Sequence, residues 1–149
     1  MTLFEQISED IKAAMKARDR VRLDTLRNIK KVFLEAKTAP GANDTLEDAD
    51  ALKIIQKLAK QGRESAATFA QQNRQDLADS ELAQVAVIES YLPQQLGEAE
   101  IEAQVREIIA ATGASNMKDM GKVMGMASKQ MAGKADGRAI AAVVRRLLS

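Results

Sequence analysis

Apolar residues recur at the three- and four-residue spacing of an α-helix along almost the whole chain, and this period constrains the fold most strongly. Only two prolines, Pro40 and Pro93, interrupt the pattern. The chain also has no run of β-branched residues of the kind that is typical of a strand. Hydrophobic residues make up 46% of the chain and charged residues 29%, which is the balance of a folded protein with a core. The sequence therefore predicts an all-α protein.

Local signals for helix starts divide the first part of this pattern. Thr2 and Glu5 have the spacing of a capping box, and the loop-forming residues Pro40 and Gly41 fall in a predicted loop at 38–44. The expected first residues of the four N-terminal helices, or their caps, are Thr2, Asp19, Thr45 and Asn73.

The best domain boundary lies at residues 93–97. Proline disfavours helix at the residue before it, and Gly97 can take a capping geometry. We therefore expect a four-helix N-terminal domain over residues 1–93 and a small three-helix C-terminal domain over residues 97–149. Of the three C-terminal helices, the first is expected to end at Gly113, the second to run from 117 to 131, and the third to start after Asp136.

Missing residue types exclude several classes of chemistry. The chain has no histidine, no cysteine and no tryptophan, which removes histidine metal sites, thiol nucleophiles and the commonest general base. Its three phenylalanines and one tyrosine are too few for an aromatic base-stacking platform. No apolar run approaches the length of a membrane span. These absences predict a cytoplasmic protein with no catalytic residues, metal ion or cofactor of its own and no membrane partner.

The segment 117–131 carries the strongest local signal. On a helix, four of its methionines fall on one face together with Val123 and Ala127, and this face predicts core. The lysines of the opposite face are Lys118, Lys122 and Lys129. Gly121 and Gly125 lie between the two faces, and a glycine inside a helix costs about 1 kcal/mol relative to alanine. They serve close packing against another helix, close approach of a ligand such as a sugar–phosphate chain, or both.

The net charge of +1 hides a basic C-terminal end, because residues 115–149 contain seven basic residues but only two acidic ones. Lys134 falls at the turn between the last two helices, and Arg138 and Arg145 lie seven apart on one side of the last helix. Together with the lysine row, these residues face one nucleic-acid backbone or form an ordinary solvated surface. The short turn is also compatible with a helix-turn-helix that binds DNA.

A second basic cluster is predicted on the helix that Asp19 begins. Arg20, Arg27 and Lys31 fall on one side of that helix, with Asp24 among them. They form either a ladder of surface ion pairs or a second contact site for RNA.

Five short motifs occur in order along essentially the whole chain. They are LDTLRNIK at 23–30, NRQDL at 73–77, YLPQQL at 91–96, DMGKVMG at 119–125 and GKADG at 133–137. Together they resemble the GatB/YqeY family.

That family is similar to the C-terminal helical and tail regions of the B subunit of the glutamine-dependent Asp-tRNA/Glu-tRNA amidotransferase, whose tail engages the tRNA. The residues that match the tail motif are Gly121, Gly125, Gly133 and Lys134. The amidotransferase tail carries a GFLVG-like stretch where this chain has GKVMG.

The resemblance implies a non-catalytic tRNA-binding accessory protein, although the family label is carbon–nitrogen ligase with glutamine as amido-N-donor. The chain contains neither a glycine-rich phosphate loop nor a Ser/Lys amidase cluster that could run that chemistry. The alternatives are an adaptor that binds a protein partner, through the Gly121/Gly125 edge or the acidic third helix, a helix-turn-helix-like DNA binder, and a catalytic component that acts only within a complex.

Overall fold

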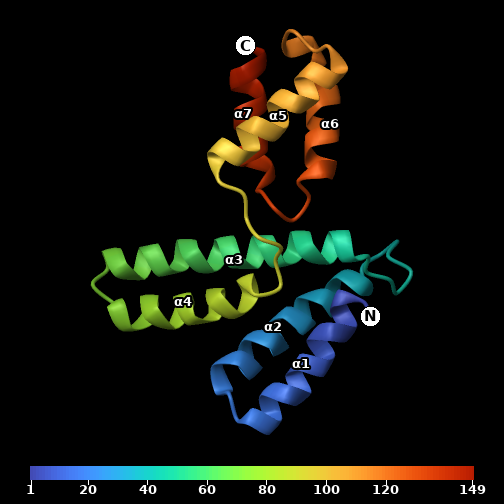
Figure 1. Ribbon diagram of the computed structural model, residues 1–149. Helices are drawn as coiled ribbons and strands as arrows, with labels where there is room; N and C mark the ends of the chain where they lie inside the picture. The colour runs from blue at the N-terminus through green and yellow to red at the C-terminus, as the bar shows by residue number, and fades with distance from the viewer. The chain divides into compact units, whose positions relative to one another are not determined.

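The structure is a computed structural model that describes all 149 residues, and every regular element in it is a helix. The prediction of an all-α protein is therefore confirmed. The chain divides into two compact units, Met1–Leu92 and Pro93–Ser149 (Figure 1). None of the helices combines the length and the apolar character that crossing a lipid bilayer requires.

Two helical pairs build the N-terminal unit, with α1 against α2 and α3 against α4 (Figure 1). Its helices are α1 (Leu3–Ala17), α2 (Arg20–Lys37), α3 (Asp48–Gln71) and α4 (Gln75–Glu89). The core centres on the apolar face of α2, where Leu26, Ile29 and Phe33 are fully buried. Ile7 from α1 and Ile55 from α3 belong to the same core.

The first two helix starts are confirmed. The Thr2 hydroxyl accepts from the Glu5 N–H at 3.1 Å, and the Thr2 N–H donates to the Glu5 carboxylate at 3.3 Å. Asp19 accepts from the Arg22 N–H at 3.2 Å and begins α2. These caps satisfy backbone N–H groups that have no partner inside their own helix.

The third helix begins later than predicted. The Thr45 hydroxyl donates to the Ala42 carbonyl at 2.7 Å and thus serves a turn within the loop. Glu47 occupies the N-cap position and α3 begins at Asp48. The Asp48 carboxylate accepts from the Leu3 N–H at 2.9 Å, which joins the start of α3 to the start of α1.

The predicted cap of the fourth helix is also shifted. Asn73 adopts a left-handed conformation with φ of 59°, which asparagine tolerates better than most residues. Arg74 is the N-cap of α4, and its guanidinium donates to both Asp76 oxygens, at 3.1 and 2.9 Å. The signal at 73–76 therefore marks the turn between α3 and α4.

The close approach of α3 and α4 depends on a glycine that the sequence patterns did not single out. A methyl group built on Gly62 would lie 2.5 Å from Cγ2 of Val85 in α4. Because valine is stiff at its first side-chain torsion, it has little freedom to move away. Gly62 therefore serves helix–helix packing.

The C-terminal unit packs three α-helices around one core. Its elements are α5 (Glu98–Thr112), the 3₁₀ turn η1 (Met117–Asp119), α6 (Met120–Gln130) and α7 (Gly137–Leu148). Val105 of α5, Val123 and Ala127 of α6 and Val144 of α7 are all fully buried. Gly113 ends α5 with a positive φ of 70°, as predicted.

The helix expected over 117–131 is divided. The Asn116 side chain accepts from the Lys118 N–H at 2.9 Å, and Asp119 accepts from the Ser115 N–H at 3.1 Å. These local bonds fix a 3₁₀ turn, after which α6 begins at Met120. Lys118 therefore lies on the turn, and Gly121 lies in the first turn of α6.

The residues that follow Pro93 are held by the C-terminal unit. The Gln95 side chain donates to the Gly133 carbonyl at 2.8 Å, and the Leu96 N–H donates to the Lys134 carbonyl at 2.9 Å. The Leu96 side chain also packs against the C-terminal core. The stretch predicted as a boundary thus contributes to the turn that carries Lys134.

Candidate nucleic-acid interface

One face of α6 is anchored in the core, and this fixes what the other face presents. Val123, Ala127 and Met131 are fully buried, and Met120 and Met124 pack partly buried against the same core. The core role predicted for this face is therefore confirmed. Met117 is an exception, because its side chain on η1 is 42% exposed.

The solvent side of α6 carries the predicted lysines and glycines. Lys122, Gly125 and Lys129 are all exposed. At about 100° per residue, Lys129 lies about 20° and Gly125 about 60° around the helix from Lys122. Gly121 is also exposed and lies about 40° around the helix from Gly125 and about 100° from Lys122. The side chains that flank Gly125 in this row are therefore basic.

Neither glycine of α6 serves helix packing. A methyl group built on Gly121 or Gly125 would meet no atom within 4 Å. The explanation by close packing against a neighbouring helix is therefore wrong, because no neighbour occupies that space. Of the two functions considered for these glycines, close approach of a ligand is the one that the open surface permits.

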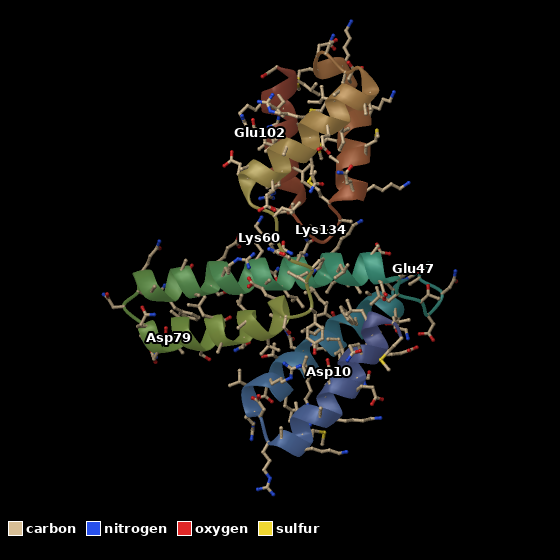
Figure 2. The ribbon with its side chains drawn as sticks, in the orientation of Figure 1. Asp10, Glu47, Lys60, Asp79, Glu102 and Lys134 are labelled. Carbon is tan, nitrogen blue, oxygen red and sulfur yellow. The ribbon has the colours of Figure 1, made fainter.

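Lys134 lies at the turn between α6 and α7 (Figure 2). Gly133, the residue before it, is buried and has a left-handed φ of 75°. Only glycine adopts this conformation without cost. The carbonyls of Gly133 and Lys134 both accept hydrogen bonds from the 93–97 segment, and these bonds fix the turn. The Lys134 side chain itself is exposed.

The last helix presents two more predicted cations. Its core side is formed by Ile140, Val143 and Val144, which are all buried. Arg138 and Arg145 lie on the exposed side, about 20° apart around the helix. Figure 1 shows α6 and α7 running in opposite directions on either side of the turn.

The six predicted cations of the C-terminal unit all lack an ion-pair partner. They are Lys118, Lys122, Lys129, Lys134, Arg138 and Arg145, and all are exposed. None of them forms an ion pair, whereas arginines elsewhere, such as Arg63 with Glu89, do. No hydrogen bond or ion pair links the α6 lysines to the α7 arginines, so their arrangement as one surface remains a prediction.

Acidic residues of the same unit are concentrated on α5, which carries four glutamates and a single arginine. Glu102 of α5 accepts from Arg146 at 3.0 Å and from Arg106 at 2.7 Å. Arg146 and then Arg106 hold the pKa of the Glu102 carboxyl below its usual value of 4.5. Arg146 is therefore engaged with α5, unlike Arg145 beside it.

The second basic cluster is only partly an ion-pair ladder. Arg20 pairs with Asp24 at 3.5 Å, but both side chains are largely exposed, so the pair contributes little stability. Arg27 and Lys31 form no ion pair and line a shallow groove of about 360 Å³ along α2. A role for these two residues in RNA binding stays a prediction.

Sequence patterns missed a polar cluster in the N-terminal unit. The Tyr91 hydroxyl donates to Asp10 at 2.6 Å, and Arg22 donates to that hydroxyl at 3.4 Å. Burial and then the Asp10 carboxylate raise the pKa of Tyr91 above its usual value of 10. The three residues are far apart in the sequence, so no local spacing could reveal them. Each of the three residues has a partner within the cluster, so the cluster joins α1, α2 and the end of α4.

No group of three or more carboxylates in the structure has an arrangement that could hold a metal ion.

Several curated fungal proteins named "Altered inheritance of mitochondria protein 41, mitochondrial" are similar to this chain. The protein from Pyrenophora tritici-repentis is 27% identical over 89% of this chain and 73% of its own length. The protein from Lachancea thermotolerans is 30% identical over 74% of this chain. The match spans only 59% of that relative's length.

These names contradict the prediction of a cytoplasmic location, because each describes the relative as mitochondrial. The composition argument failed for a physical reason. The absence of cysteines and of long apolar runs suits any aqueous compartment and does not distinguish one from another.

The model of the family described as "Yqey-like protein" matches residues 4–148, which is nearly the whole chain. That match includes both compact units and every residue of the candidate interface. The protein therefore belongs to the YqeY-like protein family.

Proposed function

We propose that this protein is a non-catalytic accessory protein that binds the backbone of a tRNA with its C-terminal unit. The observation that carries the proposal is the open surface at Gly121 and Gly125, beside lysines that have no ion-pair partner. Gly125 lies in the middle of α6, where a glycine lowers stability, and no packing contact compensates for it. A ligand whose backbone lies close to α6 gives these residues a purpose.

The chemistry of the surface favours a phosphate backbone as that ligand. Exposed lysines and arginines bind phosphates by releasing counterions, and a free cation gains more from this than one already paired. Lys122, Lys129 and Arg138 are free in this sense. Such contacts position a nucleic acid without reading its sequence.

The choice of tRNA over DNA rests on the resemblance of the tail motif to the amidotransferase B subunit. We infer from it a link to glutamine-dependent amidotransferase, with the carbon–nitrogen ligase label inherited and no ligase chemistry in this chain. We also propose that the two compact units are separate domains of four and three helices, the second of which binds the RNA.

The test compares binding of tRNA and of duplex DNA of similar length at two salt concentrations. Wild-type protein should prefer tRNA, and the Lys122→Ala/Lys134→Ala variant should lose affinity for it. The salt slope should flatten by about one unit for each phosphate that a substituted lysine no longer neutralises.

A matched control removes two exposed lysines of α3, as Lys53→Ala/Lys57→Ala, and should bind tRNA like the wild type. Equal affinity for tRNA and DNA would favour a helix-turn-helix-like DNA binder. No affinity for either at low salt would contradict nucleic-acid binding and leave the protein adaptor.

A further inference from the structure

A groove of about 510 Å³ lies between the start of α5 and the exposed side of α7, within the C-terminal unit. Its floor is apolar, because Ile101 and Val143 are buried core residues that line it. Ala139 and Ala142 keep the α7 side low, and both are exposed. This volume falls in the range of small-ligand sites.

Two of the residues that line this groove are charged. Glu98 and Arg146 line it from α5 and α7. The Arg146 guanidinium is held in place because it donates a hydrogen bond to Glu102. Glu102 is labelled on α5 in Figure 2. Glu98 forms no ion pair within 4.0 Å, so its carboxylate is available as a hydrogen-bond acceptor.

The groove borders the cations that the proposed function assigns to phosphates. Around α7, Ala142 lies about 40° from Arg138 and about 60° from Arg145. Neither arginine has an ion-pair partner. A ligand with an anionic group and a flat apolar group can therefore use the arginines and the groove at the same time.

We propose that this groove receives an unstacked nucleobase from a single-stranded part of the bound RNA, while Arg138 and Arg145 hold the adjacent phosphates. The inference rests on the proposed function, since it names a base subsite beside the phosphate surface. A guanidinium plane can stack on a base, so Arg146 supplies what the chain lacks in aromatic residues. The Glu98 carboxylate accepts from an exocyclic amino group, which favours cytosine over uracil.

The direct test is an NMR titration of the full chain with CMP, UMP and ribose 5-phosphate. CMP should shift the amide signals of Ile101 and Ala142, which line the groove, whereas ribose 5-phosphate should shift only those around Arg138 and Arg145. UMP should bind more weakly than CMP, and Glu98→Gln should remove that difference. Identical shifts with CMP and ribose 5-phosphate would overturn the base site.

A groove-filling variant tests the same site on tRNA. Ala142→Leu should weaken tRNA binding about tenfold, as expected when one base no longer stacks, with an unchanged salt slope. The control Ala110→Leu makes the same change at an exposed position of α5 that does not line the groove. Both variants should keep the wild-type melting temperature, because both positions are exposed.

The two proposals can fail separately. If Ala142→Leu binds tRNA like the wild type while Lys122→Ala/Lys134→Ala does not, the base site is overturned and the proposed function stands. If tRNA does not bind at all, the proposed function is overturned, and the CMP titration alone decides whether the groove holds a base.

Discussion

The space around three helical glycines differs: Gly62 is packed against a neighbouring helix, whereas Gly121 and Gly125 face open space. This difference separates a packing role from a surface role. A methyl on Gly62 would meet Val85 at 2.5 Å, whereas one on Gly121 or Gly125 would meet nothing within 4 Å. Sequence alone does not distinguish these cases, because each glycine occurs within a segment that has the same helical pattern of apolar residues. What separates them is the neighbour across the interface.

Alanine substitutions should therefore change stability in opposite directions. Gly125→Ala should raise the free energy of unfolding by about 0.5–1 kcal/mol, because alanine favours helix and the space is open. Gly121→Ala should gain less, since it lies in the first turn of α6. Gly62→Ala should lower stability by about 1–3 kcal/mol through overpacking against Val85. Urea unfolding of the three variants would measure this, and a stabilising Gly62→Ala would contradict the packing role.

At the scale of elements, α5 and α7 are joined across their exposed edge by Glu102. Its carboxylate accepts from Arg146 of α7 and from Arg106 of α5. These bonds favour the charged carboxylate and so lower its pKa in the folded protein. The group therefore stabilises the folded state at pH values above its usual pKa of 4.5 and loses this contribution as the pH falls below it.

Glu102→Gln should lower the melting temperature at pH 7, and the difference from the wild type should shrink as the pH falls below about 4.5. Melting curves of both proteins across this pH range would measure the effect. The control is Glu100→Gln, an exposed residue of the same helix without an ion pair. A difference that stays constant down to acidic pH would contradict the role of the charged carboxylate.

Sequence patterns located helices best where the signal is local. The Thr2 box and the Asp19 cap were predictable because both partners lie within one turn. The start of α3 was not, because Asp48 is fixed by a hydrogen bond to Leu3, 45 residues away. Likewise, the basic residues of the candidate interface were visible in the sequence, but the open space at Gly125 and the groove beside Ala142 depend on the folded surface.

At the scale of the whole molecule, the chain forms two compact units that meet in sequence at Pro93. The residues after it are part of the second unit, because Gln95 and Leu96 bond to the turn at 133–134. That turn carries Lys134 and so belongs to the proposed interface. The segment 93–97 therefore does more than connect the units, since it fixes part of the binding surface.

A fragment of residues 93–149 should fold and should be more stable than a fragment of residues 97–149. The shorter fragment lacks the Leu96 N–H bond to Lys134 and the packing of the Leu96 side chain, which together contribute about 2 kcal/mol. Chemical denaturation followed by circular dichroism would compare the two. Equal stability would show that the segment only connects the units.

The central claim is that the exposed glycines of α6 make room for a nucleic-acid backbone. The most direct measurement is the tRNA affinity of Gly125→Leu together with its melting temperature. The added side chain should weaken binding about tenfold or more by blocking close approach, while the melting temperature stays equal or rises because leucine favours helix. Ala110→Leu should bind like the wild type. Unchanged tRNA affinity in a folded Gly125→Leu protein would contradict the claim.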